Sequence, residues 1–205
     1  MRIAVLVFGR LNRCVEHYEN IMESLGDNDI DFFVSSDNPS ESLMNDFNCL
    51  YKPISSNSSA ITYYYNLSKY PGRRYETCID YMTRHFINKN RVLTLLEDYI
   101  DKTNVEYDCV VSLRVDCVFK DYFLFDSLEE NTIYIPYGSD WVENGINDQI
   151  AYGKLDVMRK YNSINPIELL NKKLSIPHPE TLNCANIKFH KLLVKRPDME
   201  YYIER

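Results

Sequence analysis

Short apolar runs alternate with helically spaced apolar positions through the first half of the chain. Arg2–Phe8 is apolar on both faces and predicts a buried strand. Apolar positions from Cys14 to Leu25 then recur at helical spacing, and Gly26 stands where a helix C-cap belongs. Ile30–Ser36 predicts a second strand. This order of strand, helix and strand is typical of an α/β protein with a parallel sheet.

The same patterns continue along the rest of the chain. They predict, in order, a short helix capped by Asp37, a third strand at Cys49–Ile54, a polar functional loop at Ser55–Arg74, a long helix at Glu76–Lys102, and strands at Tyr107–Leu113 and Thr132–Pro136. Beyond residue 141 they predict short helices at Asp148–Tyr152, Leu155–Tyr161, Pro166–Leu174 and Pro179–His190, and a last strand at Leu192–Lys195. We therefore expect one α/β domain over residues 1–205. Its central sheet is mixed, mostly parallel, with about six strands and helices on both faces.

Composition and charge narrow the possible partners. The chain has 205 residues, of which 45% are hydrophobic, enough for one buried core. Its formal net charge of −7 argues against a nucleic-acid polymer as the main partner. The first apolar run, Ile3–Phe8, is too short for a signal peptide, and no run reaches the length of a transmembrane helix. We expect a soluble, cytoplasmic protein.

Polar residues follow three of the expected strands. They are Gly9-Arg10 after the first, Ser35-Ser36-Asp37 after the second and Arg114-Val115-Asp116 after the fourth. In open parallel sheets, ligands bind at the carboxyl ends of the strands, so these residues are candidates for a binding site. The first turn has a single glycine, and no phosphate-binding G-x-x-x-x-G-K-[ST] run occurs, which disfavours a classical dinucleotide fold and a P-loop NTPase.

The segment Arg114-Val115-Asp116 has two interpretations. Asp116 lies at a strand end, where a carboxylate and a bound diphosphate can together hold a divalent ion such as Mn²⁺ or Mg²⁺. Such an ion would neutralise the charge that develops on a leaving diphosphate. The alternative is that Arg114 and Asp116 form an ordinary ion pair at the strand end. The residues alone leave both possibilities open.

Taken in order, these strand-end residues and the later Asn147-Asp148-Gln149 resemble small glycosyltransferases of the GT-A type. The chain is similar in particular to the glycosyltransferases encoded by large algal (chlorella) viruses and to related capsular or lipopolysaccharide sugar transferases. The resemblance runs from Met1 to about Arg205. It implies a nucleotide-sugar donor, most often UDP-linked, and a Mn²⁺ ion held by a D-x-D element. Here Arg114 replaces the first aspartate of that element, and only Asp116 matches.

The resemblance also implies roles along the chain. Residues 1–116 would form the nucleotide-binding half and residues 117–205 the acceptor-binding and sugar-binding half. The candidate donor-binding residues are Phe8, Gly9, Arg10, Asp37, Arg73, Arg74, Tyr81, Arg84, Arg114, Val115 and Asp116. Simpler interpretations stay open for several of them. Arg10 and the Arg73-Arg74 pair can be solvated cations, Asp37 can cap a helix, and Tyr81 and Arg84 can lie on an exposed helix face.

The acceptor half contributes a second set of candidates. Inverting transfer needs a carboxylate that takes the proton of the acceptor hydroxyl, and Asp148 is the candidate, with Asp140 behind it. In a retaining enzyme Asp148 would position the donor sugar instead. Trp141, Asn147 and Gln149 would contact the sugars, although capping of a helix also explains residues 147–149. His178 and His190 are candidates for a second metal ligand.

The expected function is thus a metal-dependent glycosyltransferase that moves a hexose-type sugar from a UDP-sugar to a glycan or glycoprotein acceptor, in the host cytoplasm if the protein is viral. One rival is a nucleotidyltransferase of related fold, although the turn at residues 9–12 is poor in glycine. The other is a non-catalytic carbohydrate-binding relative, and Arg114 in place of an aspartate is its best support.

Overall fold

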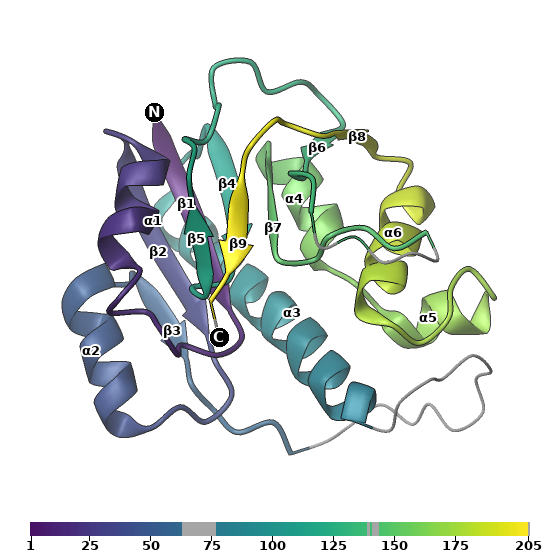
Figure 1. The fold of residues 1–205 in the computed structure, drawn as a ribbon, viewed down its shortest axis with the longest axis horizontal. Helices are drawn as coiled ribbons and strands as arrows, with labels where there is room; N and C mark the ends of the chain where they lie inside the picture. The colour runs from purple at the N-terminus through teal and green to yellow at the C-terminus, as the bar shows by residue number, and fades with distance from the viewer. Residues whose placement is uncertain (63–76, 139, 141–143, 205) are drawn as a thin grey trace.

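The fold is a three-layer α/β sandwich (Figure 1). The structure, a computed structural model, describes residues 1–62, 77–138, 140 and 144–204. Its main sheet has seven strands in the order β3-β2-β1-β4-β7-β6-β8. These are Ser55–Asn57 (β3), Asp29–Ser35 (β2), Arg2–Phe8 (β1), Cys109–Leu113 (β4), Ile150–Gly153 (β7), Thr132–Tyr134 (β6) and Leu193–Lys195 (β8).

The main sheet is mixed but mostly parallel. Every neighbouring pair that excludes β7 is parallel, whereas β7 runs antiparallel to both β4 and β6. A second sheet pairs Cys117–Phe119 (β5) with Tyr201–Ile203 (β9) in antiparallel fashion. The α/β class expected from the sequence is confirmed, with seven strands rather than about six in the main sheet.

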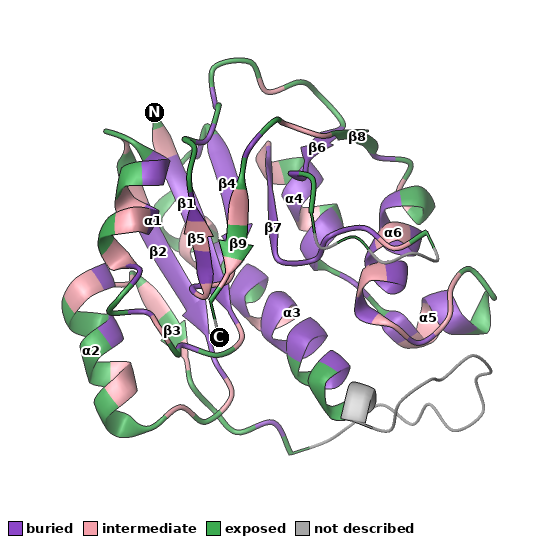
Figure 2. Cartoon of the chain, in the orientation of Figure 1, coloured by how far each residue is buried: buried purple, intermediate pink, exposed green. Residues whose placement is uncertain are grey.

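Helices cover both faces of the sheet. They are Tyr18–Leu25 (α1), Glu41–Tyr51 (α2), Thr77–Thr103 (α3), Leu155–Asn162 (α4), Pro166–Asn171 (α5) and Pro179–Phe189 (α6). Alternate residues of β1 face opposite sides, as the period of a strand requires. Ile3, Val5 and Val7 pack in the core beneath α1 and α2, whereas Ala4, Leu6 and Phe8 pack in the core beneath α3 and α4. Figure 2 shows β4 buried throughout and β1 buried beyond Arg2 at its start, which explains why Ile3–Phe8 is apolar on both faces.

The long helix α3 extends beyond the sheet. Its second half packs on the sheet through Val92 and Leu96, but Met82 and Phe86 near its start belong to a separate apolar cluster with residues of α5 and α6, among them Leu182. The first described turns of α3 therefore lie between the sheet and the C-terminal helices (Figure 1). No helix of the described residues has the length and apolar character needed to span a membrane.

Three local expectations from the sequence are wrong. Residues up to Tyr51 of the expected strand Cys49–Ile54 continue α2, because the Phe47 and Tyr51 rings stack at helical spacing with centroids 4.2 Å apart. The third strand is β3 instead. The expected helix Asp148–Tyr152 is largely strand β7, whose four residues are all buried. A buried apolar run this short has no distinguishing period.

The third error concerns the start of α2. Ser40, rather than Asp37, is the N-cap, and its hydroxyl accepts a hydrogen bond from the Leu43 N–H at 3.3 Å. The expected C-cap of α1 is confirmed. Gly26 has φ +72° and its N–H donates to the Glu23 carbonyl at 3.0 Å.

Candidate functional site

The strand order reverses direction between β1 and β4, which creates a switch point at the carboxyl ends of these strands. From β1 the chain moves outward through β2 to β3 and then returns to β4 on the opposite side of β1. In open α/β sheets ligands bind at such a switch point, outside the carboxyl ends of the strands. Gly9 follows β1 there with φ +95°, a conformation that favours glycine, and its N–H donates to the Ser35 carbonyl at 3.0 Å. The next residue, Arg10, is exposed.

Arg114 and Asp116 form a paired unit at the end of β4. Arg114 Nε donates to Asp116 Oδ1 at 2.9 Å, and Arg114 Nη2 donates to Asp116 Oδ2. Arg114 Nη1 donates to the Tyr81 hydroxyl at 2.6 Å. Burial acts against the charged form, yet Tyr81 and Asp116 together raise the pKa of Arg114. The ion pair considered as the simpler interpretation of this segment is therefore present.

Asp37 and Arg84 form a second pair close to the first. Asp37 follows β2, accepts the Ile61 N–H at 2.6 Å through Oδ1, and pairs with Arg84 Nη1 through Oδ2. Arg84 and Tyr81 are three residues apart on α3, so they lie on one face of the helix. This face joins the ends of β2 and β4. The structure thus brings together five expected donor-site residues: Asp37, Tyr81, Arg84, Arg114 and Asp116.

Asp148 lies in a buried polar cluster beside these pairs. It is 3% exposed, on the segment just before β7, and its Oδ2 is 3.4 Å from His85 Nε2. Lys89 is fully buried, with its Nζ 3.7 Å from the centroid of the Tyr161 ring and 5.6 Å from that of Phe8. Lys89 Nζ makes no hydrogen bond with any described residue, which is costly for a buried ammonium group.

Burial shifts the titration of this cluster towards neutral forms. Burial first and Glu180 second raise the pKa of Asp148 to about 6, although Arg114 and Lys89 oppose the shift. Burial also lowers the pKa of Lys89 to about 7, against the attraction of Asp148. The pKa of His85 is held well below its usual value by burial and by the nearby cations. A carboxylate that titrates near neutrality suits proton transfer to or from a substrate.

The N-terminus of α6 closes the cluster. His178 caps this helix, and its Nδ1 lies 2.7 Å from Glu180 Oε2. The Glu180 carbonyl accepts the Ile146 N–H at 3.1 Å, which ties α6 to the segment that carries Asp148. His190 lies at the other end of α6, about 18 Å along the helix axis at about 1.5 Å per residue. The structure therefore brings His178, but not His190, to the site.

Asn147, Gln149 and Asp140 hold the Asp148 segment in place. The Asn147 side chain accepts the Gln149 N–H at 2.8 Å and donates to the Tyr201 hydroxyl at 2.6 Å. Asp140 Oδ1 accepts the Asn147 N–H at 2.8 Å, and its Oδ2 pairs with Arg196. The Tyr201 hydroxyl also donates to Gln149 Oε1 at 3.0 Å. The Asn147 and Gln149 side chains, expected to bind sugar, thus make contacts that position Asp148.

Other expected residues contribute differently or are not described. The side chains of Phe8 and Val115 are buried in the core, so only their backbone can reach a ligand at the strand ends. The Val115 carbonyl lies 2.9 Å from His17 Nδ1. Arg73, Arg74 and Trp141 lie outside the described residues.

The C-terminal segment stabilises the backbone of the Arg114–Asp116 turn through hydrogen bonds. The Glu204 N–H donates to the Asp116 carbonyl at 2.9 Å. The Glu204 carboxylate lies 2.8 Å from His17 Nε2, and the other nitrogen of that ring contacts the Val115 carbonyl. Together with the pairing of β5 and β9, these bonds fix the backbone on which Asp116 stands.

The described residues do not fit a Mn²⁺ or Mg²⁺ site built on Asp116. Both of its carboxylate oxygens accept hydrogen bonds from Arg114, whose charge repels a cation. Of the other expected ligands, His178 pairs with Glu180, and His190 lies at the far end of α6. Within the described part of the chain, no group of three His, Cys, Asp or Glu side chains is arranged to hold a metal ion.

Three residues of the site were missed from the sequence: His85, Lys89 and Glu180. A signal for Lys89 exists. The apolar stripe of α3 passes through Phe86 and Leu93, and Lys89 occupies the helical position between them. A lysine at a position that the pattern assigns to the core indicates a buried charge. His85 and Glu180 carry no such signal, because their burial depends on how α3 and α6 meet β7.

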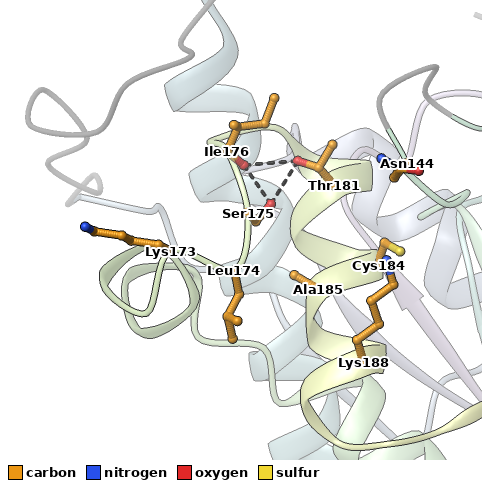
Figure 3. Close-up of a pocket in the computed structure, with 9 residues that line it drawn as sticks. All are labelled: Asn144, Lys173, Leu174, Ser175, Ile176, Thr181, Cys184, Ala185 and Lys188. Atoms are coloured by element: carbon orange, nitrogen blue, oxygen red, sulfur yellow. Dashed lines mark hydrogen bonds between the residues drawn. The ribbon is translucent and has the colours of Figure 1, made fainter.

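A surface pocket of about 380 Å³ lies between α6 and the segment that precedes this helix (Figure 3). Ser175, Ile176 and Thr181 form one wall through mutual hydrogen bonds. Cys184 and Lys188 line the pocket from α6. The Lys173 side chain points away from the other labelled residues (Figure 3). The first turn of α6 thus stands between this pocket and Asp148.

No family model matches this chain, and no curated protein matches its sequence. The function must therefore be inferred from the residues of the site.

Proposed function

We propose that the protein is a glycosyltransferase that transfers a sugar from a nucleoside diphosphate, most often UDP, to a hydroxyl group of a glycan or glycoprotein acceptor. The observation that carries the proposal is the meeting of two arginine–carboxylate pairs with a buried, near-neutral carboxyl group at the switch point of the sheet. The topology supports a nucleotide at this edge, since it lies outside the carboxyl ends of β1 and β4.

The first half of the site suits a diphosphate. Arg114 and Arg84 bring two guanidinium groups to the ends of β4 and β2, the strands on either side of β1. Guanidinium binds phosphate oxygens through paired N–H groups. Exposed Arg10 follows the turn at Gly9 on the strand between them. Since the molecule is acidic overall, this local set of cations favours a small anionic ligand over a nucleic-acid polymer.

The second half suits transfer to a hydroxyl group. In an inverting reaction the acceptor oxygen forms a bond to the anomeric carbon, the bond from that carbon to the diphosphate oxygen breaks, and its electron pair leaves with the nucleoside diphosphate. The hydroxyl proton passes to the Asp148 carboxylate, whose pKa of about 6 leaves it mostly ionised at neutral pH. His85 Nε2 approaches this carboxylate to 3.4 Å from α3, and the charge of Lys89 favours its ionised form.

As part of the same proposal, the protein acts in the cytoplasm, which is that of a host cell if the protein is viral. The division into a nucleotide-binding half at residues 1–116 and an acceptor half at 117–205 also belongs to this proposal. No step above passes through a metal ion, because the described ligands do not fit one at Asp116.

The test combines calorimetry with UDP and turnover of UDP-sugars. We expect UDP to bind wild-type protein and Asp148→Asn with affinities within threefold of each other, whereas Asp148→Asn loses at least a hundredfold in release of UDP from the sugar. Absence of UDP binding by the wild-type protein would refute the proposal. Diphosphate release from a nucleoside triphosphate would favour a nucleotidyltransferase, and glycan binding without UDP affinity would favour a non-catalytic relative.

A further inference from the structure

The Arg114–Asp116 pair occupies the place where a metal-binding carboxylate was expected. Arg114 is 14% exposed and Asp116 15%, so the pair lies at the edge of the site, where a ligand can still reach it. Guanidinium has five N–H groups, of which Arg114 directs three to Asp116 and Tyr81. Among the residues that the structure describes, the other two N–H groups are left for a further acceptor.

We propose that Arg114 neutralises the donor diphosphate directly, so that donor binding needs no divalent metal. This inference rests on the proposed function and specifies how its donor half works. Asp116 serves as a positioning residue that holds the guanidinium plane through both of its oxygens. The Tyr81 hydroxyl on α3 accepts one further N–H, from Nη1, so the guanidinium group of Arg114 is oriented before a ligand binds.

The surroundings favour an anion over a second cation. Arg84 lies one helical turn from Tyr81 and faces Asp37 at the end of β2. A divalent ion at Asp116 would have to displace Arg114 from both carboxylate oxygens and then remain beside its charge. A diphosphate does not need to displace Arg114 and is attracted by its charge. Its oxygens can accept hydrogen bonds from the Arg114 N–H groups that do not bond to Asp116 or Tyr81.

During transfer the diphosphate oxygen gains the electron pair of the breaking bond. Charge therefore grows on the oxygens that Arg114 contacts, and a fixed guanidinium stabilises that charge in the transition state. Arg114 keeps all its protons in this step, since the only proton that moves passes from the acceptor hydroxyl to Asp148.

The experiment measures UDP affinity by calorimetry for the full chain, in EDTA and in Mn²⁺. We expect the wild-type affinity to differ by less than twofold between the two conditions. Arg114→Gln should lose at least tenfold in both. Arg114→Asp restores two carboxylates and should bind UDP at least tenfold more tightly in Mn²⁺ than in EDTA. Arg159→Gln is the matched control, because Arg159 pairs with Glu97 and Asp156 outside the site, and its affinity should be unchanged.

Two results would overturn the inference. One is a wild-type affinity that rises at least tenfold with Mn²⁺ and loses this gain in Asp116→Asn, which would show that Asp116 holds a metal. The other is an Arg114→Gln variant that folds, by thermal melting, and binds UDP as wild type does. If Arg114→Gln unfolds, Arg114→Lys keeps the charge but loses the fork and should lose at least threefold. Failure of wild-type UDP binding in both conditions would instead refute the proposed function, and this inference with it.

Discussion

Replacing Lys89 with methionine should change how the stability of the protein depends on pH. Lys89 is fully buried, and burial lowers the pKa of its ammonium group from 10.5 to about 7. The unfolded chain keeps the proton up to about pH 10, whereas the folded protein loses it near pH 7. The unfolded state therefore binds more protons between these values, and stability rises with pH across that window.

The size of this effect follows from the two pKa values. Between pH 7 and pH 8.5, the difference in proton binding at Lys89 adds roughly 1–2 kcal/mol to the free energy of unfolding. Lys89→Met removes that contribution while keeping a side chain of similar length. In the variant, Asp148 loses the favourable charge of Lys89, so its pKa rises. Ionising this buried carboxyl group then destabilises the variant as the pH increases. The change in stability between the two pH values therefore differs even more between wild type and variant.

Urea denaturation at pH 7.0 and 8.5 measures both proteins under identical conditions. We expect the free energy of unfolding of wild type to gain roughly 2 kcal/mol more than that of Lys89→Met between the two pH values. Lys120→Met is the control, since Lys120 is an exposed lysine paired with Glu200, and it should follow wild type. If the stability of wild type and of Lys89→Met changes equally between the two pH values, burial does not lower the pKa of Lys89. The electrostatic description of the cluster would then be wrong.

Three further predictions concern separate parts of the structure. Phe47→Ala should lower the free energy of unfolding by about 3–5 kcal/mol in urea, because a fully buried ring is removed; a loss below about 1 kcal/mol would contradict its place in the core. Ser40→Ala should cost about 1 kcal/mol by the same assay, since a helix cap is lost, and Ser40→Asp should restore it. Arg84→Gln should weaken UDP binding at least fivefold in calorimetry, because the guanidinium beside Asp37 is removed. Arg91→Gln, farther along the same helix, should leave the affinity unchanged, and an equal loss in both variants would argue against a specific contact.

The sequence was most informative where apolar residues form a long continuous run or recur with a clear helical period. Arg2–Phe8 is buried on both faces, so its continuous apolar run identified the central strand directly. The strand ends then followed from topology, which is why Asp37, Arg114 and Asp116 were found as neighbours. Tyr81 and Arg84 were found because they lie off the apolar stripe of α3, on the face that crosses those strand ends.

The sequence was least informative where tertiary contacts override local pattern. β5 and β9 have three residues each and form only because they meet across the chain, so no local period marks them. Whether Arg114 would pair with Asp116 or leave it free for a metal was likewise undecidable from spacing. The outcome depends on the Tyr81 hydroxyl, which α3 brings from a distant part of the sequence. Lys89 was overlooked because a single charged residue in an apolar stripe is usually read as surface.

The bond from the Glu204 N–H to the Asp116 carbonyl joins the middle of the chain to its last described residue. A ribosome that is still making residues 196–204 cannot yet have released the segment that fixes the Arg114–Asp116 turn. The nascent chain can fold most of its parallel strands first, but it gains this part of the site only when translation has passed residue 204. A chain that stops before residue 196 would therefore lack the hydrogen bond that fixes the Asp116 backbone.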